Sequence, residues 1–130
     1  MPTITFAQAL KQARAKIYRY PDAWRVAVLC GSGPQLTYAF DEARLTLGAS
    51  SLPLEKISYA ERTIETERGG YFKFIAPLDW GAEAVQGRNF THYMWLFDPS
   101  VKPGLEELLR PHLRSPSVPP EDCLEHHCTL

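Results

Sequence analysis

The chain lacks an excess of charge of either sign, and this excludes two classes of charged protein. Its 130 residues include 14 Lys and Arg against 15 Asp and Glu, for a net charge of −1. A protein that coats nucleic acid needs a bulk basic excess, and a mimic of DNA needs strong acidity. Neither class fits this composition.

Cysteine and long apolar runs are also scarce. There are three cysteines, and an odd number without an export signal argues against a disulfide framework. No apolar run approaches the roughly 18 residues of a membrane span. The N-terminus MPTITFAQAL lacks the charged-then-apolar order of a secretion signal. We therefore expect a cytoplasmic protein with no membrane partner.

Apolar and aromatic residues are plentiful enough for a packed core. They make up 45% of the chain, with six Phe, six Tyr and three Trp. A chain of this length buries roughly two thirds of its unfolded surface as one domain. The last stretch, RSPSVPPEDCLEHHCTL, is rich in proline. We predict a single domain over residues 1–113 and an extended tail without regular structure over 114–130.

Two elements are predicted near the N-terminus. Thr5 and Gln8 fit a capping box, which satisfies free amides at the start of a helix. The apolar residues that follow at helical spacing are Phe6, Ala9, Leu10, Ala13 and Ile17. Alternating residues from Trp24 to Cys30 then predict a strand.

The stretch VLCGSGP allows two interpretations. Glycines after a strand can cradle a phosphate, but such a loop needs a helix N-terminus directly after it. Here the run from Leu36 to Phe40 is rich in aromatic and β-branched residues, and no Gly-Lys-Ser/Thr is present. We therefore predict a β-hairpin turn at Gly31–Pro34 with no nucleotide site. A short helix should begin at Asp41 and end near Gly48.

The second half predicts further short elements. Residues 54–67 fit a helix or a strand, and a strand over 61–67 is favoured. Other predicted elements are strands at Tyr71–Ala76 and Asn89–Phe97, a helix from Asp79 to Val85, and a helix containing Leu105, Leu108 and Leu109. The predicted fold is α+β: a mainly antiparallel sheet of four or five strands with two to three helices packed on one face.

The stretch RGGYFKFI resembles the core strand of RNA-recognition motifs, which places stacking rings on an open sheet face. It departs from that pattern because a second glycine replaces the first aromatic residue. The order of the predicted elements differs as well. We favour a glycine turn that leads into a strand, with Phe72 and Phe74 in the core and Tyr71 and Lys73 pointing outward. The core should also contain Trp24 and Leu96.

A second resemblance covers residues 5–47. The stretches ARAKIYRYPDAWRV and LTYAFDEARL resemble small proteins of unknown function encoded by phages and plasmids. The resemblance implies an origin in a mobile element and supplies no catalytic residues. An anti-defence inhibitor, such as an anti-CRISPR protein, is the most concrete role that it implies.

Candidate catalytic and metal-binding residues are few. Cys123, His126 and Cys128 are residue types that bind zinc, but adjacent ligands within six residues cannot readily surround a tetrahedral ion. Cys30 and His92 lie in apolar strands, where buried and unreactive side chains are the usual outcome. Gly-x-Ser-x-Gly and His-Glu-x-x-His motifs are missing. We predict a protein without enzymatic activity, metal or cofactor.

Positive charge gathers near the N-terminus. Residues 1–40 carry five basic residues against Asp22 alone, a net charge of +4. The candidate partner-binding residues are Lys11, Arg14, Lys16, Arg19 and Arg25. The sequence therefore predicts a small non-catalytic protein that occupies a protein or ribonucleoprotein partner. The alternative is a nucleic-acid-binding accessory protein that uses this basic face.

Overall fold

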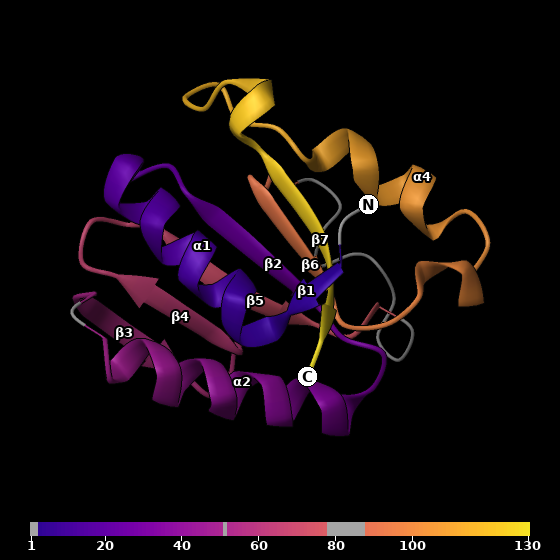
Figure 1. Cartoon of the computed structure of the whole chain (residues 1–130), viewed down its shortest axis with the longest axis horizontal. Helices are drawn as coiled ribbons and strands as arrows, with labels where there is room; N and C mark the ends of the chain where they lie inside the picture. The colour runs from indigo at the N-terminus through magenta and orange to yellow at the C-terminus, as the bar shows by residue number, and fades with distance from the viewer. Residues whose placement is uncertain (1–2, 51, 78–87) are drawn as a thin grey trace.

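A computed structural model describes residues 3–50, 52–77 and 88–130, and these form a seven-stranded sheet with helices on both faces (Figure 1). The strands are β1 (Thr3–Thr5), β2 (Arg25–Leu29), β3 (Leu54–Ser58), β4 (Thr63–Thr66), β5 (Tyr71–Ile75), β6 (His92–Trp95) and β7 (Leu124–Thr129). The helices are α1 (Phe6–Arg19), α2 (Gly33–Gly48) and α4 (Leu105–Leu109), with 3-10 turns η1 (Pro99–Val101), η2 (Arg110–His112) and η3 (Pro120–Asp122).

The sheet is mostly parallel, so the prediction of a mainly antiparallel sheet of four or five strands is wrong, although the α+β class holds. The strand order is β1-β7-β6-β2-β5-β4-β3. The first five strands in this order pair in parallel, and β3 and β4 add antiparallel pairs at one edge. The cause lies in the connections. Helix α1 connects β1 to β2 and α2 connects β2 to β3, and each crossover brings the chain back so that the next strand runs in the same direction, whereas a short turn would have reversed it.

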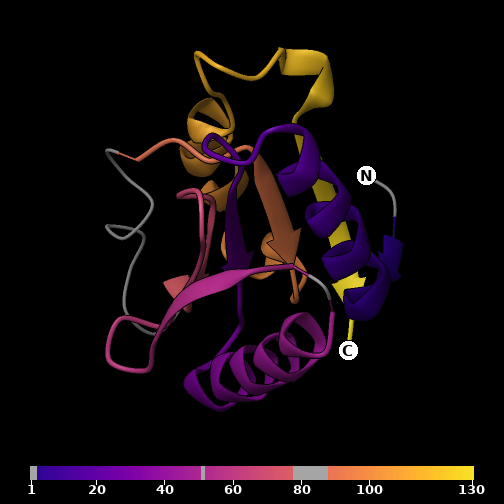
Figure 2. The same cartoon turned by 90° about the vertical axis from the view of Figure 1, so that its left-hand side faces the viewer.

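Helices cover both faces of the sheet, not one face as predicted. Helices α1 and α2 pack on the face that carries Val26, Val28 and Phe74. Helix α4 packs on the opposite face, which carries Leu29 and Trp95 (Figure 2). Strands β2 and β6 are therefore buried on both sides. Their apolar sequences RVAVL and HYMW are typical of central parallel strands.

Helix α1 forms as predicted from its sequence. The Thr5 hydroxyl accepts a hydrogen bond from the Gln8 amide, and the Gln8 side chain accepts one from the Thr5 amide. The five apolar residues predicted for its inner face are all buried. Lys11 and the other cations of α1 therefore lie outside the core that α1 and α2 cover.

Helix α2 contradicts the prediction of a hairpin at Gly31–Pro34 and of a strand after it. Its N-cap is Ser32, whose hydroxyl accepts a hydrogen bond from the Gln35 amide, and Pro34 lies in its first turn. The buried residues of α2 are Leu36, Ala39, Phe40, Ala43 and Leu47, at helical spacing. Packing of this stripe against the sheet overrides the strand preference of the aromatic run.

The glycine turn at 68–70 and the core that follows it are confirmed. Gly69 has a φ of +101°, which a residue with a side chain rarely adopts. Strands β4 and β5 pair antiparallel across this turn. Phe72 and Phe74 are buried in the core, as are Trp24 and Leu96. Tyr71 and Lys73 point to the other face and are half-buried.

The expected C-terminal tail contains a strand. Strand β7 lies between β6 and β1 and pairs in parallel with both (Figure 1). Val118, inside the proline-rich stretch, is buried in the core that α1 and α2 cover. The prolines that suggest an extended tail all precede β7, so they leave Leu124–Thr129 able to pair as a strand. The predicted helix from Asp79 to Val85 lies outside the described residues.

Candidate interaction surface

Four of the five candidate binding residues, Lys11, Arg14, Lys16 and Arg19, lie on α1. Lys11 is exposed, and Arg14 is half-buried. Lys16 and Arg19 lie near the end of the helix, where their nitrogens are 3.6 Å and 3.8 Å from the Asp122 carboxylate. Helix α1 contains no acidic residue. No acidic side chain of α1 itself therefore compensates this positive charge, and the carboxylate that contacts it, that of Asp122, comes from η3.

Asp122 is the one acidic partner of this cluster within the described residues. The Tyr20 hydroxyl donates a hydrogen bond to its carboxylate. This hydrogen bond, followed by the charges of Lys16 and Arg19, lowers the pKa of Asp122. The contact holds the segment before β7 against the end of α1. Lys16 and Arg19 thus have a structural explanation, whereas no ion pair joins Lys11 or Arg14 to another described residue.

Arg25 lies apart from the other four cations. It is the first residue of β2, and its guanidinium stands 5.8 Å from the centre of the Tyr71 ring. Tyr71 packs on the core on the opposite side of the sheet from α1. The five predicted residues therefore do not form one basic face.

Helix α2 exposes large apolar side chains that the sequence prediction missed. Tyr38 is 57% exposed and Leu45 is 60% exposed. They are seven residues apart, which places them on the same side of a helix. The exposed Tyr59 packs edge-on against the ring of Phe40. A strand prediction for 36–40 could not reveal this helical stripe.

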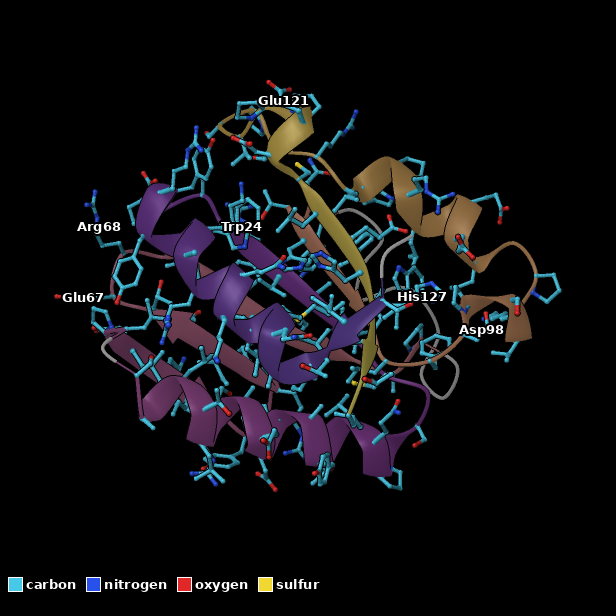
Figure 3. All side chains as sticks on the ribbon, in the orientation of Figure 1. Trp24, Glu67, Arg68, Asp98, Glu121 and His127 are labelled. Carbon is cyan, nitrogen blue, oxygen red and sulfur yellow. The ribbon has the colours of Figure 1, made fainter. Side chains whose placement is uncertain are left out.

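An apolar groove lies where α1 ends and the chain leaves α2. Its volume is about 200 Å³. The lining residues are Ile17, Tyr18, Pro21, Leu52, Pro53, Thr66, Glu67 and Arg68. Figure 3 shows Glu67 and Arg68 at this side of the molecule. We refer to Tyr18, Tyr38, Leu45 and Pro53, all exposed, as the α1–α2 surface.

The loop before α2 contains a glycine and lies between a strand and a helix, an arrangement that suits a phosphate. Contacts within the chain occupy this loop instead. The Gln35 Oε1 accepts a hydrogen bond from the Gly31 amide at 2.6 Å. The Gln35 Nε2 donates to the Leu96 carbonyl at 3.0 Å. A Cβ on Gly31 would lie 3.1 Å from the Phe97 Cβ. These contacts leave the loop a structural role in joining β2 to the end of β6.

Two histidines form a buried pair between α1 and the sheet. The His92 Nε2 and the His126 Nδ1 are 3.1 Å apart. Burial, followed by the charges of His126 and Lys16, lowers the pKa of His92 to about 3. Burial also lowers the pKa of His126. Both rings are therefore neutral near pH 7, and a fully buried His92 cannot exchange protons with a substrate in solvent.

The cysteines offer no activated nucleophile. Burial raises the pKa of Cys30 and of Cys128 to about 12, so both are thiols at neutral pH. Burial raises the pKa of Cys123 as well. The described part of the chain contains no cluster of three or more His, Cys, Asp or Glu side chains that could hold a metal ion.

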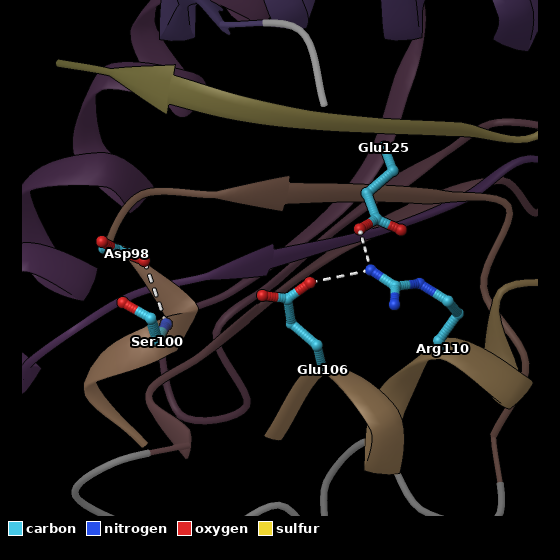
Figure 4. Close-up of polar contacts among 5 residues, drawn as sticks. All are labelled: Asp98, Ser100, Glu106, Arg110 and Glu125. Carbon is cyan, nitrogen blue, oxygen red and sulfur yellow. Dashed lines mark hydrogen bonds and ion pairs between the residues drawn. The ribbon is translucent and has the colours of Figure 1, made fainter. Parts of the chain in front are cut away.

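A polar cluster on the α4 side joins α4 to β7 (Figure 4). The Arg110 guanidinium donates to Glu106 at 2.8 Å and to Glu125 at 3.3 Å. Nearby, the Asp98 carboxylate accepts a hydrogen bond from the Ser100 amide at 3.0 Å, which lowers the pKa of Asp98. Each group is already paired within the chain. The cluster therefore explains how α4 is held and supplies no free acid or base.

Comparison with known proteins identifies no family for this chain. No family model matches its sequence, and no curated protein is significantly similar to it. Within the described residues, no helix combines the length and the apolar character needed to cross a membrane.

Proposed function

We propose that this chain is a non-catalytic cytoplasmic protein that binds a protein partner through the α1–α2 surface. The observation that carries the proposal is the pair Tyr38 and Leu45, which expose more than half of their surface on one side of α2. Scattered exposed apolar residues are common on monomers. Two of them aligned on one side of a helix form a larger apolar target than a single exposed residue.

The composition of this surface supports a protein partner. Tyrosine and arginine are enriched among the residues that dominate binding energy at interfaces. The α1–α2 surface offers the exposed rings of Tyr18 and Tyr38, and α1 also carries Lys11 and Arg14. The groove beside Leu52 can accept one apolar side chain of the partner. A partner can thus bury the apolar residues at its centre and keep charged groups at the rim.

The charge of α1 favours an acidic edge on that partner. Lys11 and Arg14 have no carboxylate partner within the part of the chain that the structure describes. Opposite charges across a rim mainly accelerate association, and salt weakens this effect. Apolar contacts at the α2 side should persist at high salt.

A paired-variant capture experiment tests the proposal. Tyr38→Ser with Leu45→Ser removes the apolar stripe. Val101→Ser, at a residue that is 63% exposed in η1, is the matched control. A partner captured from host extract by the wild type should be lost by the double variant and retained by the control. Equal capture by all three proteins would contradict the assignment of this surface.

The inhibitory form of the proposal draws its support from the resemblance of residues 5–47 to phage and plasmid proteins. Inhibition by occupying a partner needs a surface and no catalytic group. In cells with active CRISPR interference, the wild-type chain should restore transformation by a targeted plasmid, and the Tyr38 and Leu45 double variant should not. Unchanged interference in the presence of the wild type would argue against the anti-CRISPR form.

A further inference from the structure

A second pocket, distinct from the α1–α2 surface, lies beside the start of β2. It encloses about 140 Å³ and is lined by Asp22, Ala23, Arg25, Asn89, Arg114, Ser115, Pro116 and Ser117. Sites that hold drug-sized ligands begin at roughly 300 Å³. This pocket is smaller, so it suits a single small group. Most of its lining residues have polar side chains, in contrast to the apolar groove by α1.

Backbone contacts place the polar residues of this pocket together. The Phe90 amide donates to the His112 carbonyl at 2.8 Å, and Phe90 forms a parallel bridge with Leu113. Asn89 and Arg114 directly flank this bridge. The residues come from three parts of the sequence, yet hydrogen bonds fix two of these parts to each other.

Arg25 is fixed by separate contacts. Its amide donates to the Thr91 Oγ1 at 2.8 Å, and the Thr91 hydroxyl donates back to the Arg25 carbonyl at 3.0 Å. Its guanidinium lies over the Tyr71 ring, which packs edge-on against Phe90. An aromatic ring contacts the face of a guanidinium and leaves its N–H edge able to donate. The charge is therefore positioned before any ligand binds.

The charges of the pocket favour an anion. Arg25 and Arg114 both line it, and neither forms an ion pair with a carboxylate among the described residues. Among the described residues of the lining, Asp22 is the one that is acidic, so their net charge is positive. Arginine donors form a fork that matches the oxygens of a phosphate. The Asn89 amide and the Ser115 and Ser117 hydroxyls add donors for the oxygens of such a group.

We infer that Arg25, Asn89, Arg114, Ser115 and Ser117 form a binding site for a phosphate group. The group comes either from a small phosphomonoester or from the phosphodiester backbone of a nucleic acid. The site shares no residue with the α1–α2 surface or with the groove beside it, and it does not depend on the partner proposed for that surface.

Amide chemical shifts measured by NMR during titration with inorganic phosphate test this site directly. At constant ionic strength, the amides of Asn89, Ser115 and Ser117 should shift in a saturable manner. Arg114→Gln should weaken phosphate binding by about tenfold or more, because it removes a charge-assisted donor. Lys102→Gln, at an exposed residue next to η1, is the matched control and should leave phosphate binding unchanged. The thermal midpoint should be similar for all three proteins, since Arg114 is exposed.

Three outcomes would overturn the inference. The first is a lack of saturable shifts with phosphate. The second is an equal response to acetate, which would indicate a general effect of anions. The third is wild-type affinity in Arg114→Gln.

A parallel titration with a short single-stranded oligonucleotide separates the two sources of the group. Tighter binding of the oligonucleotide, lost in Arg114→Gln, supports nucleic acid, whereas binding of phosphate alone supports a small phosphomonoester.

Discussion

At the scale of single residues, His92 and His126 should make the stability of the fold depend on pH. Both pKa values are lowered by burial in the folded state, that of His92 to about 3. An unfolded histidine has a pKa of about 6.5. Between these values the unfolded chain binds more protons than the folded chain, so the free energy of unfolding should fall as the pH decreases. Above about pH 6.5 the pair should contribute no pH dependence.

Urea unfolding from pH 7.5 to pH 4 measures this effect. His92→Leu removes one titrating group, so its stability should decline less steeply over this range than that of the wild type. His112→Gln leaves the buried pair intact and should keep the wild-type slope. A wild-type slope in His92→Leu would show that other groups control the acid sensitivity.

The side chain of Gln35 should contribute measurably to stability. It accepts from the Gly31 amide and donates to the Leu96 carbonyl, so it joins the start of α2 to the end of β6. Gln35→Ala removes both hydrogen bonds and should lower the free energy of unfolding by about 1–3 kcal/mol. Gln12→Ala, at an exposed position of α1, should change it little. Denaturant titration compares the two, and equal values would contradict the bridging role.

At the scale of elements, β7 should be required for folding. It pairs with β6 on one side and β1 on the other, so its loss exposes the backbone groups of both strands. Deletion of residues 123–130 should abolish cooperative thermal unfolding. Removal of Leu130 alone, which is exposed and follows the strand, should leave the midpoint nearly unchanged. A wild-type midpoint in the longer deletion would mean that β7 is dispensable, as a free tail would be.

Local signals predicted some elements well and others poorly. The Thr5 capping box and the apolar stripe of α1 are local, and the helix follows them. The direction of the strands depends on the paths of the connections. The pattern of β2 and β6, apolar on both faces, was the available sign of parallel pairing. Strand β7 could not be predicted from its pattern, because its sequence LEHHCT is polar and follows several prolines.

The candidate site could be predicted only in part, because some of its contacts join residues that are far apart in the sequence. Uncompensated cations on α1 are visible in the sequence, since the helix contains no acid. The contacts of Lys16 and Arg19 with Asp122 join residues about a hundred positions apart, and sequence spacing carries no signal for them. Tyr38 and Leu45 share a face only once residues 33–48 are known to be helical.

At the scale of the whole molecule, the basic charge of α1 should affect the rate of partner binding more than stability. Lys11→Glu with Arg14→Glu reverses two charges at the rim of the α1–α2 surface. The association rate should fall, and the difference from the wild type should shrink at high salt. The thermal midpoint should change little, because exposed charges contribute little to folding. Lys102→Glu, an exposed control next to η1, should associate at the wild-type rate. Identical rates for all proteins at low salt would assign the α1 cations to solubility alone.

Hydroxyl-radical footprinting of the captured complex tests the central claim most directly, because it reports the exposure of individual side chains. The α1–α2 surface and the α4 side each carry exposed apolar residues, so each side serves as the control for the other. Binding through the α1–α2 surface predicts that the partner reduces oxidation of Tyr38 and Leu45 and leaves Val101 and Leu108 unchanged. Protection of Val101 and Leu108, with Tyr38 and Leu45 still oxidised as in the free protein, would contradict it.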